Sequence, residues 1–182
     1  MFITGSRHIA LAAMFSSIIA TCTNDTTRTL NLAPHYYNGT VDVEHLSVPG
    51  NLDGFKMSTP AARQSADFWY FDVLSQSTNQ TLNIVFFNSG DFVQYTHPLA
   101  VQVSGTHSNG TDFYYEAMAD SGVTIINGPR GISGEWKGIG MFDGSPLDEP
   151  SVEYTIRIDS DDMDIRGAIN FKAVRSPHFR NY

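Results

Sequence analysis

Residues 67–74 (DFWYFDVL) carry large apolar side chains on both faces of the β-strand that they are predicted to form. The side chains alternate between two faces, with Trp69, Phe71 and Val73 on one and Phe68, Tyr70 and Leu74 on the other. After a polar turn, the next strand runs through Leu82, Ile84 and Phe86 and ends its apolar face on an amide, Asn88. Since a strand at the surface of a sheet normally keeps one polar face, we expect this hairpin to be covered on one side and to line a pocket on the other.

The rest of the chain repeats short apolar runs between Gly, Asn and Asp turns, which predicts an all-β fold. These runs cover residues 98–104, 112–118, 122–126, 132–142, 151–159 and 165–174. About eight or nine antiparallel strands at this spacing form either an up-and-down barrel or a sandwich. Residues 59–67 depart from the pattern, because Pro60 can begin one or two helical turns there.

Glycines favour the barrel over the sandwich. Gly134, Gly138 and Gly140 fall on alternate or near-alternate positions, where missing side chains let a sheet coil and close. A closed barrel of about eight strands holds one small apolar ligand. We therefore predict a lipocalin-like antiparallel barrel with a hydrophobic small molecule as its partner.

Length and charge narrow the class of protein further. At 182 residues, 41% of them hydrophobic, the chain has the size and composition of one folded domain. Its formal net charge is -8, and its eleven Lys and Arg residues are scattered along the sequence. Nucleic acid is therefore not an expected partner, because phosphate backbones are bound by clustered basic residues.

The N-terminus has the pattern of a secretory signal peptide. Arg7 and His8 precede the apolar run 9–20, and small residues lie around Cys22, where cleavage is expected. The run is too short to span a bilayer, so no membrane partner is expected for the mature protein. The predicted organisation is a signal peptide over residues 1–22, a flexible segment over residues 23–40 and a barrel domain over residues 41–182.

Sequons agree with passage through the secretory pathway. The four N-x-[ST] triplets begin at Asn24, Asn38, Asn79 and Asn109. They predict a secreted glycoprotein. Because Cys22 is the single cysteine and lies in the expected cleavage zone, neither a disulfide nor a cysteine nucleophile is expected.

Standard catalytic motifs are absent from the sequence. There is no G-x-S-x-G elbow, no H-E-x-x-H pair and no phosphate loop. The six histidines lack metal-ligand spacing, and the acidic turn at residues 159–164 lacks the glycine and distal glutamate of an EF-hand. We therefore expect neither a metal nor a cofactor.

The aromatic hairpin is then the candidate site. A buried indole, phenol or carboxamide needs a hydrogen-bond partner, so Trp69, Tyr70 and Asn88 are less readily explained as plain core than Phe68 and Phe71. An apolar face that ends in an amide suits a ligand that is mostly hydrocarbon and has one carbonyl.

Three segments resemble, in order and spacing, the N-terminal barrel of the fungal lipocalin-like Diels-Alderases, a family related to carotenoid hydratases of the hydroxyneurosporene synthase type. The segments are DFWYFDVLSQSTNQTLNIVFFNS, SGVTIINGPRGISGEWKGIG and MDIRGAINFKAVRSPHF. The resemblance covers residues 41–179.

The resemblance implies a cofactor-independent pericyclase of secondary metabolism that orients a polyketide-derived diene or a quinone methide for cycloaddition. With its predicted leader, the chain looks closer to the hetero-Diels-Alderases that join a tropolone-derived quinone methide to a sesquiterpene. Family members usually have two barrels in tandem, with the substrate in the first. A second barrel or another copy of this chain is therefore a predicted partner.

The resemblance also assigns roles to residues. Asn88 looks like the family's pocket amide and is predicted to donate a hydrogen bond to a substrate carbonyl. Asp67 stands where several relatives have a glutamate and is the second catalytic candidate. The residues that would form the pocket walls are Trp69, Tyr70, Phe86 and Trp136.

Two alternatives stay open at this point. One is a secreted, non-catalytic carrier of a hydrophobic metabolite with the same apolar pocket. The other is a hydratase or isomerase of the carotenoid-hydratase kind, which needs a proton donor such as Asp67.

Overall fold

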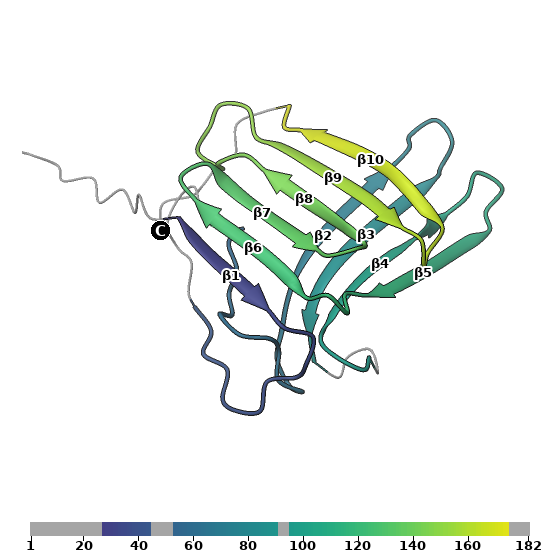
Figure 1. Ribbon diagram of the computed structural model, residues 1–182. Coiled ribbons are helices and arrows are strands. Elements are labelled where there is room, and N and C mark those ends of the chain that lie inside the picture. Colours follow the sequence, from purple (N-terminus) through teal and green to yellow (C-terminus); the bar gives the residue numbers. More distant parts are fainter. Residues whose placement is uncertain (1–26, 45–52, 91–94, 175–182) are drawn as a thin grey trace, which may run out of the picture.

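The computed structural model describes residues 27–44, 53–90 and 95–174, and these residues form ten β-strands and no helix. The larger sheet has six strands in the order β1, β6, β7, β8, β9, β10, and the smaller has the order β2, β3, β4, β5. The sheets lie face to face, and their strands cross at a steep angle (Figure 1). The larger sheet contains β1 (Arg28–Leu32), β6 (Val123–Gly128), β7 (Gly131–Trp136), β8 (Gly140–Gly144), β9 (Glu153–Ser160) and β10 (Ile165–Lys172). The smaller sheet contains β2 (Ala66–Leu74), β3 (Thr81–Ser89), β4 (Leu99–Thr106) and β5 (Asp112–Met118).

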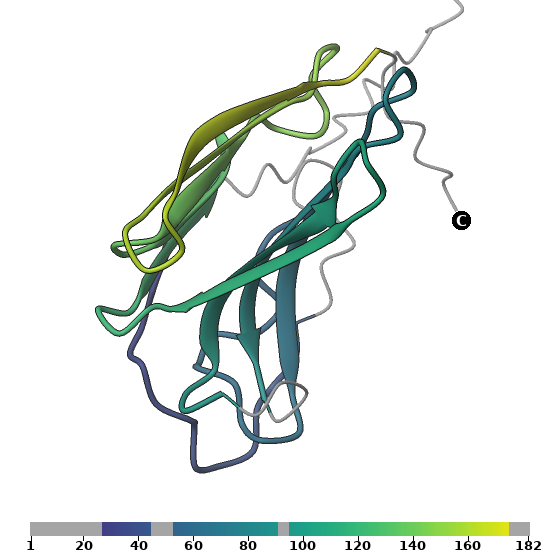
Figure 2. The same ribbon diagram turned by 90° about the vertical axis from the view of Figure 1, so that its right-hand side faces the viewer.

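The all-β prediction is confirmed, and the architecture is a barrel-like sandwich. Every strand pair is antiparallel. Figure 2 shows the two sheets as separate layers seen edge-on. No helix of the described residues is long and apolar enough to cross a membrane.

The inward faces of the two sheets share one aromatic core. Trp69 of β2 and Phe86 of β3 contact Trp136 of β7, with ring centroids 5.7 and 5.0 Å apart. Phe142 of β8 packs against all three of these rings. The indole N–H of Trp136 donates a hydrogen bond of 2.9 Å to the carbonyl oxygen of Phe87. This bond satisfies a buried donor and ties the larger sheet to the smaller one.

The hairpin of β2 and β3 has one inward and one outward aromatic face. Trp69 pairs with Phe86 and Phe71 with Ile84, which places these side chains toward the larger sheet. On the outward face Phe68 and Tyr70 are 53% and 57% exposed. The described residues place no second layer over this face. The expected cover from a second barrel or a second copy of the chain therefore stays a prediction.

The glycines predicted to bend the sheet have two different roles. Gly134 and Gly140 lie on the inward face, where the rings of Phe142 and Trp136 and the side chain of Ile158 come close. Gly138 has a φ of 82° and lies in the turn between β7 and β8. Such a φ is easily adopted by glycine, which explains why the single strand expected at residues 132–142 is two strands.

Two further elements differ from the sequence prediction. Residues 28–32 form β1, which pairs with β6, although residues 23–40 were expected to be a flexible segment. The strand was missed because RTLNL offers only two alternating apolar residues, and its pairing with β6 could not be foreseen. The helical turns expected at residues 59–67 are absent, because β2 already begins at Ala66 and Asn88 holds the preceding backbone.

The predicted export features fall only partly within the described residues. The signal peptide at residues 1–22, Cys22 and the sequon at Asn24 lie outside them. Asn38 is exposed, and Asn79 and Asn109 are exposed in the turns that follow β2 and β4. Glycosylation and export stay predictions.

Close packing at Gly134 gives the first test. A Cβ atom there would lie 2.6 Å from Cε1 of Phe142 and 2.8 Å from Cζ3 of Trp136, both in the middle of the core. Gly134→Ala should therefore lower the free energy of unfolding by about 1–3 kcal/mol. Urea denaturation measures the change, and Ser133→Ala, on the outward face of the same strand, should cost less than about 0.5 kcal/mol. Equal stability of the two variants would contradict the packing described.

Candidate functional site

A pocket of about 560 Å³ lies at the edge of the smaller sheet, where β2 faces β9 and β10. Its apolar walls include Trp69, Phe71 and Phe171, and its polar lining residues are Asp53, Lys56, Asp67, Asp72 and the hydroxyl-bearing Tyr70 and Tyr154. Residues 53–57 bring two of the ionisable groups to the pocket from a segment that precedes β2. A concave, mostly apolar surface with a few convergent polar groups is typical of a small-molecule site.

Asp67 holds residues 53–57, the segment that carries Asp53. Its Oδ2 accepts hydrogen bonds from the backbone N–H of Lys56 at 2.6 Å and of Met57 at 3.3 Å. Asp67 is buried, and burial raises its pKa, while the hydrogen bonds from the backbone of residues 56, 57 and 68 and the charge of Lys56 act in the opposite direction. The carboxyl group at the start of β2 therefore fixes residues 56 and 57 against the strand edge.

Asp53 is the second acid of the pocket. Its carboxyl Oδ2 accepts a hydrogen bond from the hydroxyl of Tyr154 on β9, and its backbone carbonyl accepts the indole N–H of Trp69 at 2.8 Å. Burial raises the pKa of Asp53, and the Tyr154 hydrogen bond partly opposes this effect. Burial also raises the pKa of the Tyr154 phenol, so its hydroxyl stays a donor at neutral pH. Asp53 thus joins the smaller sheet, through Trp69, to the larger sheet, through Tyr154.

Lys56 brings one positive charge to a site with three carboxyl groups, those of Asp53, Asp67 and the exposed Asp72. Its ammonium Nζ donates a hydrogen bond of 2.5 Å to the carbonyl oxygen of Gly54. Burial lowers the pKa of Lys56, while the charges of Asp67 and, to a smaller extent, Asp53 raise it. One ammonium balances one buried carboxylate. Backbone N–H groups around Asp67 favour its charged form, but burial is the largest effect at both acids and raises the pKa of each.

The wall opposite these acids is aromatic. Phe71 lies within ring-contact distance of Tyr154 at 5.6 Å and of Phe171 at 6.0 Å, measured between centroids. Phe71 also contacts Phe86 and Phe142, so the pocket wall is continuous with the buried core. An apolar ligand in this pocket would meet ring faces on one side and the acids on the other.

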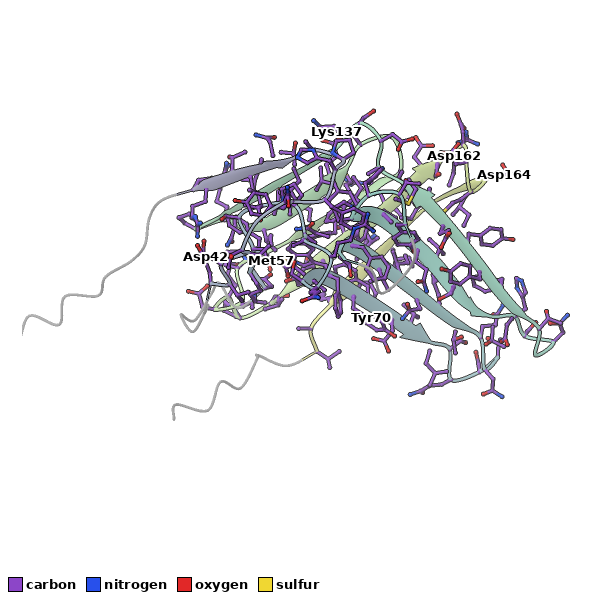
Figure 3. All side chains as sticks on the ribbon, turned by 90° about the horizontal axis from the view of Figure 1, so that it is seen from below. Asp42, Met57, Tyr70, Lys137, Asp162 and Asp164 are labelled. Carbon is purple, nitrogen blue, oxygen red and sulfur yellow. The ribbon has the colours of Figure 1, made fainter. Side chains whose placement is uncertain are left out.

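The structure brings three of the predicted site residues to the pocket. Asp67, Trp69 and Tyr70 all line it. The indole of Trp69 is already bonded to Asp53, and Tyr70 lies on the outward face, beside a second hollow of about 800 Å³ over the smaller sheet. Figure 3 shows Tyr70 far from Asp162 and Asp164, which lie together in the turn between β9 and β10.

Asn88 is buried behind the pocket rather than exposed in it. Its Oδ1 accepts the backbone N–H of Ala61 at 2.7 Å, and its Nδ2 donates to the carbonyl oxygen of Thr59 at 3.0 Å. The amide therefore clamps residues 59–61 onto β3. Donation from Nδ2 to a substrate carbonyl would require loss of the Thr59 bond, and this predicted role is not tested by the structure.

Phe86 and Trp136, the remaining predicted wall residues, are fully buried in the core. They support Phe71 and Trp69 from behind, and their contact with a ligand stays a prediction. Sequence reasoning missed Asp53, Lys56, Tyr154 and Phe171. Tyr154 had a usable signal, because a phenol within the apolar face of the strand at residues 151–159 needs a hydrogen-bond partner.

Within residues 27–44, 53–90 and 95–174, no group of three or more His, Cys, Asp or Glu side chains could hold a metal ion. In the acidic turn between β9 and β10, Arg166 forms ion pairs with Asp159 and Asp161.

Known proteins provide an independent comparison. The sequence profile of the Diels-Alderase-like family matches residues 36–181. The quinolone epoxide rearrangement protein penF of Penicillium thymicola is 36% identical over 149 residues, and asqO of Emericella nidulans, which has the same description, is 33% identical over 148. No solved structure matches the chain.

The chain belongs to the Diels-Alderase-like family, as its resemblance predicted. Each match covers 79% of this chain but only 41% and 40% of the two relatives. The chain therefore spans about two fifths of the length of these curated relatives.

The clamp at Asn88 gives a second test. Asn88→Ala leaves the Ala61 N–H and the Thr59 carbonyl without their buried partner and should cost about 2 kcal/mol or more of unfolding free energy. Asn83→Ala, on the outward face of the same strand, should cost less than about 0.5 kcal/mol. Urea denaturation compares the two. An Asn88→Ala protein of unchanged stability that has lost turnover would contradict the clamp and support the predicted donor role.

The raised pKa of Asp67 makes stability depend on pH in a defined direction. The folded state holds the Asp67 proton more tightly than the unfolded state does, and this difference stabilises the fold. The stabilisation is fully present below the ordinary pKa of an aspartic acid and is lost as the pH rises through the raised pKa of Asp67. Asp67→Asn removes this dependence. Between about pH 4 and about pH 7 the stability of the wild type should therefore fall relative to that of the variant. Urea denaturation measures both proteins. If the stability of the wild type instead rose relative to that of Asp67→Asn, the backbone amides would outweigh burial and lower the pKa of Asp67.

Proposed function

We propose that the pocket at the β2 edge is the acid-bearing site of a secondary-metabolite enzyme that rearranges an epoxide. One observation carries the proposal: Asp53, whose pKa is raised by burial, lies in an aromatic pocket with its carboxyl group held by the Tyr154 hydroxyl. A neutral carboxyl group beside an apolar wall is suited to donate a proton to a substrate oxygen. The relatives penF and asqO are named quinolone epoxide rearrangement proteins.

The proposed reaction is an isomerisation. Asp53 gives its proton to the epoxide oxygen as one carbon–oxygen bond breaks and its electron pair passes to that oxygen. The carbon left short of electrons takes the pair of a migrating neighbouring bond, which leaves a protonated carbonyl. This group returns its proton to the Asp53 carboxylate, so the product has the composition of the substrate and the acid is restored.

The surrounding residues have separate tasks in this proposal. The rings of Phe71 and Phe171 face the positive charge that develops on carbon and stabilise it through their π electrons. The Tyr154 hydroxyl stabilises the Asp53 carboxylate formed after proton transfer, because its hydrogen bond strengthens when the acceptor is charged. Asp67 and Lys56 position the segment that carries Asp53.

Cycloaddition, the reaction expected from the resemblance, is the second candidate, and the family assignment and the aromatic walls favour it. It transfers no proton, and its predicted hydrogen-bond donor is the amide of Asn88, which does not titrate. The pH profile then distinguishes the reactions. A rearrangement that needs protonated Asp53 slows as the pH rises through its raised pKa, whereas a cycloaddition keeps its rate over the range in which the fold is stable.

Turnover of quinolone epoxides by the purified chain tests the proposal. Asp53→Asn should lower kcat about 10²- to 10⁴-fold and remove the pH dependence, and Tyr154→Phe should lower it about fivefold. Glu135→Gln, on the outward face of β7, should leave the rate unchanged. Liquid chromatography with mass spectrometry measures an isomer of unchanged mass.

Three outcomes would contradict the proposal. A folded chain that binds the epoxide and leaves it unchanged would support the carrier alternative. A product heavier by one water would indicate a hydratase. An Asp53→Asn protein with an unchanged rate would remove Asp53 as the proton donor, and a simultaneous loss of rate in Asp67→Asn would assign that role to Asp67.

A further inference from the structure

Gly167 on β10 is not explained by the packing of the protein. It lies opposite Ile158 of β9, whose side chain is buried in the core, so position 167 is on the inward face of the larger sheet. Gly167 is exposed, and a Cβ atom built there would meet no atom of the described residues within 4 Å outside its chain neighbours; its φ lies outside the left-handed region. An ordinary side chain would therefore fit at this position without strain.

The other inward-facing glycines of the sheet are tightly enclosed. A Cβ atom at Gly134, Gly140 or Gly144 would come within 2.6, 2.6 or 2.3 Å of a neighbouring atom. Those glycines are required by their surroundings. Glycine within a strand also weakens the strand, because it loses more backbone freedom on folding than other residues. Within the part of the chain that the structure describes, no close contact therefore requires glycine at position 167.

The open position continues the wall of the proposed site. Phe171, which lines the pocket, lies on the same face of β10 as Ile169 and Gly167, and residues 169 and 171 pair with Ile156 and Tyr154 of β9. Ile169 and Ile165, on either side of Gly167, are only half-buried. At about 3.3 Å per residue, Gly167 is about 13 Å along the strand from Phe171. Phe171, Ile169 and Gly167 therefore form a row along the inward face of β10 that leads from the pocket to the unfilled position.

The opposite sheet is also incompletely covered on its inward side. Tyr115 of β5 pairs with the buried Val103 and so lies on the inward face, yet it is 44% exposed. Val73 of β2 pairs with Leu82 on the same face and is 37% exposed. As the outer strand of its sheet, β10 pairs only with β9 among the described strands (Figure 1).

We infer that Gly167 sets the size of substrate that the enzyme accepts, by leaving room along the inward face of β10 for an apolar substituent of the molecule whose epoxide meets Asp53. The inference rests on the proposed function. The substrate class is then an elongated molecule with the reacting oxygen at one end and an apolar ring or chain at the other. The apolar end of such a molecule fills the space that a side chain at position 167 would occupy.

The test compares Gly167→Val with Ala168→Val, which adds a similar group to the next residue, on the outward face of β10. Both variants should raise the urea midpoint, because both replace a poor strand former with a β-branched residue. Kinetics are then measured with quinolone epoxides whose substituent grows from methyl to butyl to phenyl. Gly167→Val should lower kcat/KM about tenfold or more for phenyl and leave methyl within about twofold, and Ala168→Val should match the wild type throughout.

Two results would overturn the inference. One is a Gly167→Val protein that treats all three substituents as the wild type does. The other is an equal loss for methyl and phenyl, which would indicate a general effect on the site. Absence of turnover in the wild type is a different outcome, because it contradicts the proposed rearrangement. In that case, binding of the neutral dye Nile red still tests whether the space at position 167 admits an apolar molecule. Gly167→Val should weaken dye binding, and Ala168→Val should not.

Discussion

The burial of the Asp67 carboxyl group is the constraint on which the site depends. A carboxylate in this position must be satisfied, and it takes the backbone N–H groups of Lys56 and Met57. These bonds fix residues 53–57 along the outer edge of β2. Asp53 is thereby placed between the two sheets, where Trp69 and Tyr154 bind its two ends. Asp67 therefore positions Asp53, the second acid of the pocket.

The aromatic core explains why the pocket forms at this edge. Phe71 fills the end of the interior and touches rings from β3, β8, β9 and β10. At the same edge, the polar bridge from Asp53 to Tyr154 joins the segment before β2 to the larger sheet. The two aromatic faces of the hairpin then have different roles. The inward face builds the core and the pocket wall, whereas Phe68 and Tyr70 remain exposed on the other side of the sheet.

Much of the fold could be predicted from the sequence, because alternation is a local signal. Residues 112–118 were expected as a strand and form β5 with the same bounds, and the strand expected at 151–159 is β9 with shifted ends. β1 could not be predicted, since two alternating leucines are too short a pattern and the strand is defined by its pairing with β6.

The site was harder to predict than the fold, because Asp53 and Tyr154 are 101 residues apart in the sequence. The need of Trp69 for a hydrogen-bond partner was foreseen, but a backbone carbonyl of an unassigned segment was not a predictable partner.

The protonation state of the two acids tests the central claim most directly. The carboxyl carbon resonances of Asp53 and Asp67 can be followed by NMR as the pH is raised, and Asp53→Asn and Asp67→Asn assign the two signals. The expected result is that Asp53 titrates above the ordinary range of aspartic acids, so that it still holds its proton where an ordinary aspartic acid is ionised. Titration of Asp53 at or below the ordinary value would contradict its role as the proton donor of the pocket.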